Sequence, residues 1–142
     1  MDKTHYQNRT WATRQRPWID RLASAWLIKT FIDNTPTFIW LETPHDCPKE
    51  ALGFDFDGAT FSHINHWVTF EVLLHSFNLE TPALKKIAEI VHYLDIGGIE
   101  PTEAIGIEKI IQGLRCQISN DDQLLELSSH IFDGLYTNFS RE

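Results

Sequence analysis

The segment EIVHYLDIGG, residues 89–98, places a histidine and an aspartate where an amphipathic helix should be apolar. On a helical wheel at about 100° per residue, the apolar side chains of residues 81–95 form one face. Asp95 falls inside this face, and His92 lies at its edge, three residues earlier and therefore beside it. A carboxylate is disfavoured in an apolar interior and at the negative end of a helix dipole. Asp95 must therefore be protonated, ion-paired, bonded to backbone N–H groups or bound to a metal.

A second aspartate, Asp20, is predicted to point inward from a helix over residues 17–33. Arg14 and Arg16 alternate along the strand predicted before this helix and therefore share a face. Arg21 follows on the first helical turn, beside free backbone N–H groups. Forked guanidinium groups at a helix start suit a tetrahedral oxyanion, but Arg14 or Arg16 could instead neutralise Asp20. We therefore predict an anion-binding or supporting group made of Arg14, Arg16, Asp20 and Arg21.

Histidine supplies the other ligands of a candidate metal site. His63 belongs to the motif HINH at a predicted strand end, where a strand feeds into a loop. Glu71 follows in the first turn of the next predicted helix, although acids favour that position for the helix dipole alone. A mixed nitrogen and oxygen set without thiolate suits zinc, iron, manganese or nickel. The predicted ligands are His63, Glu71, His92 and Asp95, and sequence alone does not establish that they converge.

Composition limits the classes of protein and partner. The net charge of −8 argues against general affinity for nucleic acid, and the concentration of basic residues near the N-terminus suits a small anionic ligand. Cys47 and Cys116 are too few and too far apart for a disulfide framework or a thiolate zinc site. No apolar run approaches the ~20 residues that span a bilayer, and the N-terminus lacks a signal-peptide pattern. We expect a cytoplasmic protein with no membrane partner.

The predicted elements form one α+β domain over residues 10–142, preceded by a loose tail over residues 1–9. The domain should be mainly helical, with about five helices and a small, mostly antiparallel sheet. Strands are predicted at about 10–15 and 37–42, with two short β segments in 53–63 joined by a turn at Asp57-Gly58. Helices are predicted at about 17–33, 70–77, 81–95, from near Pro101 onward, and 121–139.

Four motifs, WATRQRPWIDRLASAWLIKTFID, FDFDGATFSH, TFEVLL and IVHYLDIGG, occur in this order. In these motifs the chain resembles the chromate-resistance protein B domain family over about residues 10–138. The resemblance implies a role in bacterial chromate resistance and carries a polar signature at Arg14, Arg16, Asp20, Arg21, His63, Glu71, His92 and Asp95. Longer members resemble regulators with a winged-helix DNA-binding part ahead of this domain. Only a short segment precedes Trp11, so we expect the stand-alone form without direct nucleic-acid binding.

One motif departs from the family pattern. The chain has Ala23-Ser24-Ala25-Trp26 where many members have Ala-Cys-Pro-Trp, which argues against a thiol-based redox role at this point.

Three hypotheses remain open. The first is a metal-binding, oxyanion-responsive domain with a partner such as chromate. The second is a metal-dependent hydrolase or oxidoreductase acting on a small anion, with His92 or Glu71 as general base. The third is an interaction module with a purely structural polar core, and the oligomeric state, a dimer included, is left open.

Overall fold

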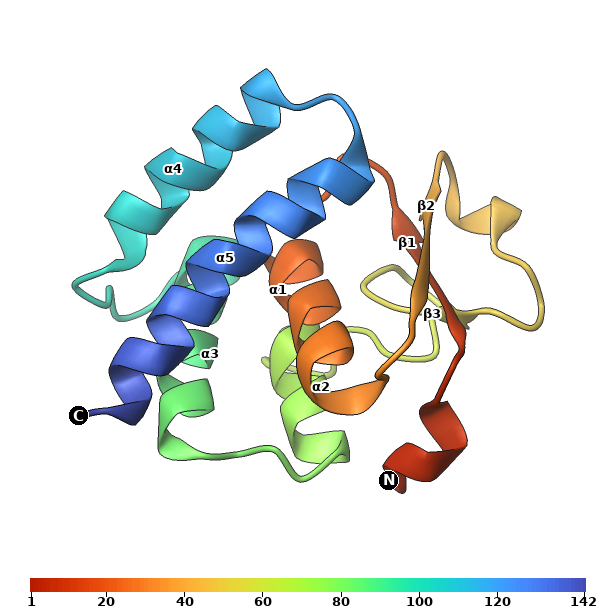
Figure 1. Ribbon diagram of the computed structural model, residues 1–142, viewed down its shortest axis with the longest axis horizontal. Helices are drawn as coiled ribbons and strands as arrows, with labels where there is room; N and C mark the ends of the chain where they lie inside the picture. Colours follow the sequence, from red (N-terminus) through yellow and green to blue (C-terminus); the bar gives the residue numbers. More distant parts are fainter.

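The computed structural model describes residues 1–142 and places a small sheet against a set of helices (Figure 1). The sheet has three strands, with β1 (Thr10–Arg14) between β2 (Thr37–Leu41) and β3 (Leu52–Gly53). Both pairs are parallel: Thr10 lies opposite Thr37 and Trp11 lies opposite Leu52. The predicted mostly antiparallel sheet is therefore wrong, whereas the α+β class and the five helices agree with the structure.

The connection between the first two strands explains the parallel direction. β1 is followed by α1 (Ile19–Leu27), which continues as the π-helical segment η2 (Ile28–Ile32) before β2 begins. A helix between two strands carries the chain back along the sheet, so the second strand runs parallel to the first. The Asp57-Gly58 turn is present, since Ala59 N–H donates to the Phe56 carbonyl at 3.0 Å. No antiparallel hairpin surrounds it, because Phe54 and Phe61 form only a single parallel bridge.

The later helices lie within a few residues of their predicted positions because their ends carry strong capping signals. Thr81 Oγ1 accepts a hydrogen bond from Leu84 N–H at the start of α3, and Asn120 Oδ1 accepts one from Gln123 N–H at the start of α5. α3 ends at Gly97, whose φ of +95° is a conformation that glycine adopts without strain. The four helices are α2 (Thr69–Ser76), α3 (Pro82–Ile96), α4 (Ala104–Gln117) and α5 (Asp121–Ser140).

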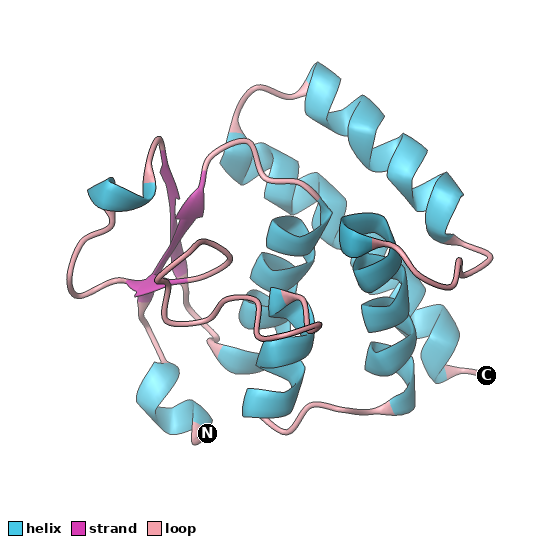
Figure 2. Ribbon diagram, turned by 180° about the vertical axis from the view of Figure 1, so that it is seen from behind, coloured by secondary structure: helices cyan, strands magenta, loops and turns pink.

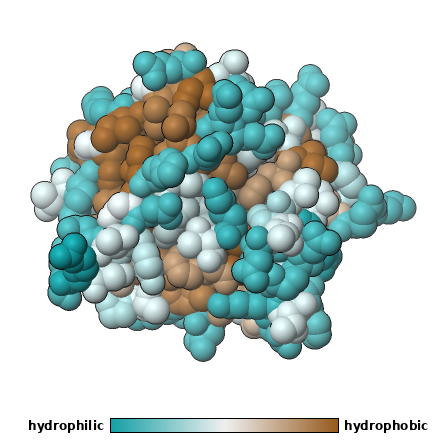
Figure 3. Space-filling view, in the orientation of Figure 1, coloured by the Kyte–Doolittle hydropathy of each residue, from teal (hydrophilic) through white to brown (hydrophobic).

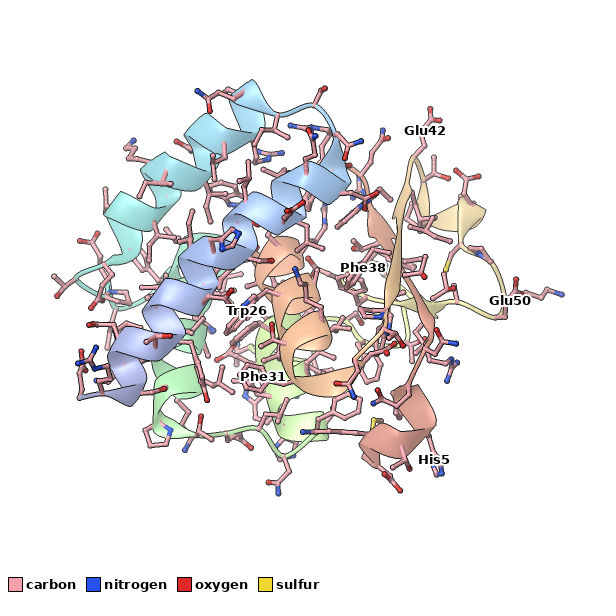
Figure 4. The ribbon with its side chains drawn as sticks, in the orientation of Figure 1. His5, Trp26, Phe31, Phe38, Glu42 and Glu50 are labelled. Carbon is pink, nitrogen blue, oxygen red and sulfur yellow. The ribbon has the colours of Figure 1, made fainter.

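The main core lies around α1, which packs against α2, α3 and α5. Trp26 and Phe31, labelled in Figure 4, stand between α1 and α5, and the Trp26 ring lies 5.6 Å from that of Phe132. α4 packs on α3 and α5. Ile110 and Leu127 remain exposed there, and Figure 3 shows a brown area across α4 and α5. None of the helices combines the length and the apolar character needed to cross a membrane.

Two short 3-10 segments complete the fold, η1 (Lys3–Tyr6) and η3 (Pro44–Asp46). The N-terminal segment is tied to the end of η2 by Asp33, which is 0% exposed. The Asp33 carboxylate accepts hydrogen bonds from the backbone N–H groups of Asn8, Arg9 and Thr35 at 2.8, 2.9 and 3.0 Å. It also accepts one from Trp11 Nε1 at 3.0 Å. Every partner of this buried carboxylate is therefore an uncharged N–H group.

The connection from β3 to α2 crosses from the sheet to the helices, where Figure 2 shows it in pink. It spans residues 54–68 and includes His63 and Asp55. Asp55 has a positive φ of +59°, which aspartate tolerates better than most residues. This long connection is the element that brings residues from outside the regular structure to the ends of α1, α2 and α3.

Candidate functional site

Asp20 lies in the first turn of α1, and its carboxylate, which is 2% exposed, caps the N-terminus of α2. Its Oδ2 accepts a hydrogen bond from the backbone N–H of Thr69 at 3.1 Å, and its Oδ1 accepts one from that of Phe70 at 3.0 Å. Ser24 Oγ, one turn further along α1, donates to Oδ1 at 3.4 Å. Asp20 thus points inward as predicted, and two backbone N–H groups supply part of the hydrogen bonds that a buried carboxylate needs.

His63 brings three carboxylates together. Its Nε2 lies 3.0 Å from Asp20 Oδ2, 3.3 Å from Asp55 Oδ1 and 3.3 Å from Asp95 Oδ2. The His63 side chain is 42% exposed and that of Asp95 is 23% exposed, so the cluster is open to solvent on one side. One donor atom each from Asp20, His63 and Asp95 lies within 4.8 Å of the others. We name Asp20, Asp55, His63 and Asp95 the carboxylate cluster.

The electrostatics of the carboxylate cluster follow from its burial and its like charges. The hydrogen bond to Asp20, supported by the charges of Asp55 and Asp95, raises the pKa of His63 to about 9, so its imidazolium balances part of the negative charge at neutral pH. Burial, with the neighbouring carboxylates, raises the pKa of Asp20 to about 6. Burial likewise raises the pKa of Asp95, and Asp55 adds to the effect. The positive charge of His63 therefore does not fully offset the negative charges of Asp20, Asp55 and Asp95.

Glu71 and His92 form a second hydrogen-bonded pair beside the carboxylate cluster. His92 Nδ1 lies 2.8 Å from Glu71 Oε1, which also accepts a hydrogen bond from the backbone N–H of Val68 at 3.0 Å. His92 lies one turn before Asp95 in α3, and a proton on its imidazole would favour the ionised form of Asp95. The structure thus pairs His63 with Asp95 and His92 with Glu71, so the four predicted metal ligands form two adjacent pairs.

Arg16 joins the end of β1 to the C-terminal helices. Its Nη1 donates to Asp121 Oδ1 at 2.9 Å and to the carbonyl groups of Ile118 and Ser119 at 3.0 and 3.1 Å. Its Nη2 donates to the carbonyl of Arg115 at 2.6 Å. These bonds engage most of the donors that were expected to meet an anion. Arg16 therefore contacts Asp121 rather than Asp20.

Arg14 and Arg21 lie closer to the carboxylate cluster. Arg21 Nε is 3.6 Å from Asp55 Oδ2, and burial, together with nearby Arg14 and Arg115, lowers its pKa. Arg14 is exposed at the end of β1 and lines a cavity of about 290 Å³ together with Asp55 and His63. Neither arginine pairs with Asp20, whose partners are described above. Their guanidinium groups therefore border the carboxylate cluster on the side of the sheet.

Two residues at this site were not predicted from the sequence. Asp55 contacts His63, Arg21 and Thr69, whose Oγ1 donates to Asp55 Oδ1 at 2.9 Å. The only signal for it in the sequence is the alternation of acids and aromatics in FDFD, which predicts a β segment. Arg115 lies in α4 and donates through Nη2 to the Arg16 carbonyl at 3.0 Å. Its position in a helix 99 residues from Arg16 gave no signal in the sequence.

The arrangement has the chemistry of a cation site. Two or three carboxylates and one imidazole are a donor set that divalent metals bind in proteins. Buried carboxylates with raised pKa values and a specific histidine partner are also typical of functional sites. The donor atoms of Asp20, His63 and Asp95 already face one another, so the residues present fit a divalent ion. Asp55 and His92 border the same three side chains.

Comparison with known proteins gives one family. The chain matches the family model described as "ChrB, C-terminal domain" over residues 11–139. It is 53% identical over 140 residues to Protein ChrB of Cupriavidus metallidurans, covering 98% of this chain and 43% of that protein. The chain thus spans less than half the length of this relative. No solved structure matches it.

Proposed function

This chain belongs to the ChrB C-terminal domain family, and we propose that it binds a divalent metal and responds to a small oxyanion such as chromate. The role in chromate resistance follows from the resemblance of its motifs to the chromate-resistance family. We further propose that it acts in the cytoplasm. The observation that carries the proposal is the convergence of three carboxylate oxygens on His63 Nε2 at 3.0–3.3 Å.

The metal would be held by Asp20, His63 and Asp95, with Asp55 as a third carboxylate beside them. Oxygen donors outnumber nitrogen donors, so manganese or iron is favoured over zinc or nickel. A bound divalent ion would supply positive charge and a position for an oxyanion or water. Asp20 is fixed by Thr69 and Phe70, so this ligand is positioned before any ion binds.

The oxyanion would be held by arginines at the edge of the same site. Arg14 shares a cavity with His63, and Arg21 contacts Asp55, so both guanidinium groups adjoin the proposed metal position. Arg115 also lies near Arg21. Guanidinium groups match the spacing of oxygens in tetrahedral anions and are not deprotonated at physiological pH. Arg16 is left out of the proposed anion site, because Asp121 and backbone carbonyls engage its donors.

Metal analysis tests the first half of the proposal. Protein purified without a nickel column and incubated with Mn²⁺ should retain close to one ion per chain after gel filtration. Asp95→Asn should lose it, whereas Asp57→Asn, the same change at an exposed position in the connection over residues 54–68, should retain it. Retention far below one ion per chain in the wild-type protein, with Mn²⁺, Fe²⁺, Zn²⁺ and Ni²⁺ alike, would exclude the proposed metal site.

Chromate titration tests the second half. Calorimetry of the metal-loaded protein should show chromate binding that weakens at least fivefold in Arg14→Gln, because one guanidinium accounts for about 1–3 kcal/mol at a charged hydrogen bond. Arg141→Gln removes the same charge from an exposed position at the other end of the molecule and should leave binding unchanged. Equal weakening in both variants would mean that only net charge matters, and would remove Arg14 from the site.

A further inference from the structure

The Glu71–His92 pair lines a cavity that the proposed metal and anion sites do not use. The cavity has a volume of about 540 Å³, which is in the range of small-molecule sites. Its wall is formed by Glu71, Glu89, His92 and the segment Gly97–Ile99, with Pro101. A Cβ atom at Gly97 or Gly98 would meet nothing within 4 Å, so the backbone at these two residues is exposed and no side chain covers this part of the wall. The cavity is thus accessible and lies where α3 ends.

The hydrogen bond to Glu71 fixes which nitrogen of His92 is free. Glu71 is itself held by the Val68 backbone N–H, so its Oε1 is a fixed acceptor for His92 Nδ1–H. The neutral imidazole then has its proton on Nδ1 and its lone pair on Nε2. No protein group bonds to Nε2, and the side chain lies at the cavity wall. A histidine held in this way by a carboxylate is ready to accept a proton through Nε2.

The groups around the cavity determine which ligand charge it accepts. Glu89 lies one turn before His92 on the same helix and lines the same cavity. The negative end of the α3 dipole lies within a turn of His92. Together with Glu71, these groups place negative charge at the cavity wall and disfavour an anionic ligand. The ligand of this cavity therefore differs in charge from the oxyanion proposed for the arginines.

We propose that His92, positioned by Glu71, is a general base that acts on a small uncharged substrate bound in this cavity, so that the domain also has hydrolytic activity. An uncharged carboxylic ester is the probe for this reaction. His92 Nε2 takes a proton from a water molecule as the water oxygen bonds to the acyl carbon. The bond from that carbon to the leaving oxygen then breaks, and the alcohol leaves with the electron pair. The proton on Nε2 passes to the leaving group or to solvent, which restores His92.

Hydrolysis of 4-nitrophenyl acetate by the full chain, in excess EDTA, tests the proposal. We expect His92→Gln to lower kcat/KM at least tenfold, since general-base catalysis contributes about 10²–10⁴-fold in rate. The matched control is His75→Gln, because His75 Nδ1 also lies near a carboxylate, 3.1 Å from Glu80 Oε1, but its side chain is 63% exposed and outside this cavity. His75→Gln should leave the rate unchanged. An equal loss in both variants, or no loss in His92→Gln, overturns the proposal.

Two further measurements separate this site from the metal site and test Glu71. The rate should be the same in excess EDTA and with Mn²⁺ present, because the reaction needs neither a metal nor a residue of the carboxylate cluster; a rate that requires Mn²⁺ would overturn the assignment to the cavity. Glu71→Gln should lower kcat about threefold and shift the His92 tautomer away from Nδ1–H, as seen in long-range ¹H–¹⁵N spectra, since a neutral amide is the weaker acceptor. Unchanged spectra in folded Glu71→Gln would remove its positioning role. The ester result and the Mn²⁺ result are thus independent.

Discussion

Asp20 and Asp33 are both buried carboxylates with four hydrogen-bond partners, yet their surroundings have opposite effects on their charge. Asp33 accepts only from uncharged N–H groups of Asn8, Arg9, Trp11 and Thr35. Although burial alone would raise its pKa, these bonds lower the pKa of Asp33 below the ordinary value. Burial and the adjacent Asp55 and Asp95 instead raise the pKa of Asp20 to about 6. The number of partners therefore does not decide the role of a buried carboxylate.

The difference lies in whether the charge is needed by the fold. Asp33 ties the N-terminal segment to the end of η2, and its ionised form is the one that the fold stabilises. The carboxylate cluster gathers three acids around a histidine, so it carries an electrostatic cost that packing does not require. Charged groups that face one another and lower the stability of the folded state are typical of binding sites, because function can require an arrangement that does not maximise stability. The following predictions test this division between a structural carboxylate and a functional cluster.

The largest effect on stability is expected at Asp33. Asp33→Asn removes the charge and turns part of the acceptor into a donor that faces buried N–H groups. Each buried donor left unpaired costs about 1–3 kcal/mol, so we expect the free energy of unfolding to fall by about 3 kcal/mol. Urea unfolding followed by circular dichroism measures this change. A loss below about 1 kcal/mol, within the range of ordinary surface substitutions, would contradict the structural role.

Metal addition should give the second largest effect and should separate the two aspartates. At a free Mn²⁺ concentration of about 100 Kd, binding to the native state alone raises the free energy of unfolding by about 2.7 kcal/mol. Asp33→Asn should keep this increment although it starts from lower stability, whereas Asp95→Asn should lose it. Thermal unfolding with Mn²⁺ and with EDTA measures both. An increment that survives in Asp95→Asn would show that the ion binds elsewhere.

Acid should weaken the contribution of Asp33. Because its pKa is lower in the folded state than the ordinary 3.8, the folded protein binds this proton less readily than the unfolded chain. The stabilisation is therefore fully present above the unfolded pKa and is lost as pH falls through the folded pKa. The difference in unfolding free energy between wild type and Asp33→Asn should be constant from pH 7 to pH 5 and should shrink below pH 4. A difference that grows on acidification would have the wrong sign.

The sequence predicted the helices better than the sheet. Periodicity and caps such as Thr81 and Asn120 are local signals, so the helix positions followed from them. Strand direction depends on the connection, and the strand–helix–strand order of β1, α1 and β2 imposes a parallel pair. The predicted elements already contain this strand–helix–strand order, which is incompatible with an antiparallel pairing of β1 and β2. The order of these elements therefore predicts the parallel pair.

The site was most predictable where an element has a regular period, although the motif HINH also indicated His63 in an irregular connection. Asp20 and Asp95 stood out because a helical wheel shows a charged residue among apolar ones. Asp55 lies in an irregular connection with a φ of +59°, and contacts with Thr69 and Arg21 place it in the site. Such long-range contacts have no local pattern. Arg16 was expected to bind an anion because of its charge. In the structure its guanidinium group instead forms an ion pair with Asp121, 105 residues away.

The smallest predicted effect has the opposite sign to that of Asp33. In metal-free protein, Asp95→Asn removes one of the crowded carboxylates near His63, and burial already disfavours its charge. We expect the variant to be more stable than wild type by about 0.5–1 kcal/mol, as is common when a functional site is relieved of strain or like charge. Urea unfolding in EDTA measures this difference, with Asp57→Asn as the exposed control. If Asp95→Asn were instead as destabilising as Asp33→Asn, the His63–Asp95 contact would be a structural ion pair, and the cluster would lose its distinction from Asp33.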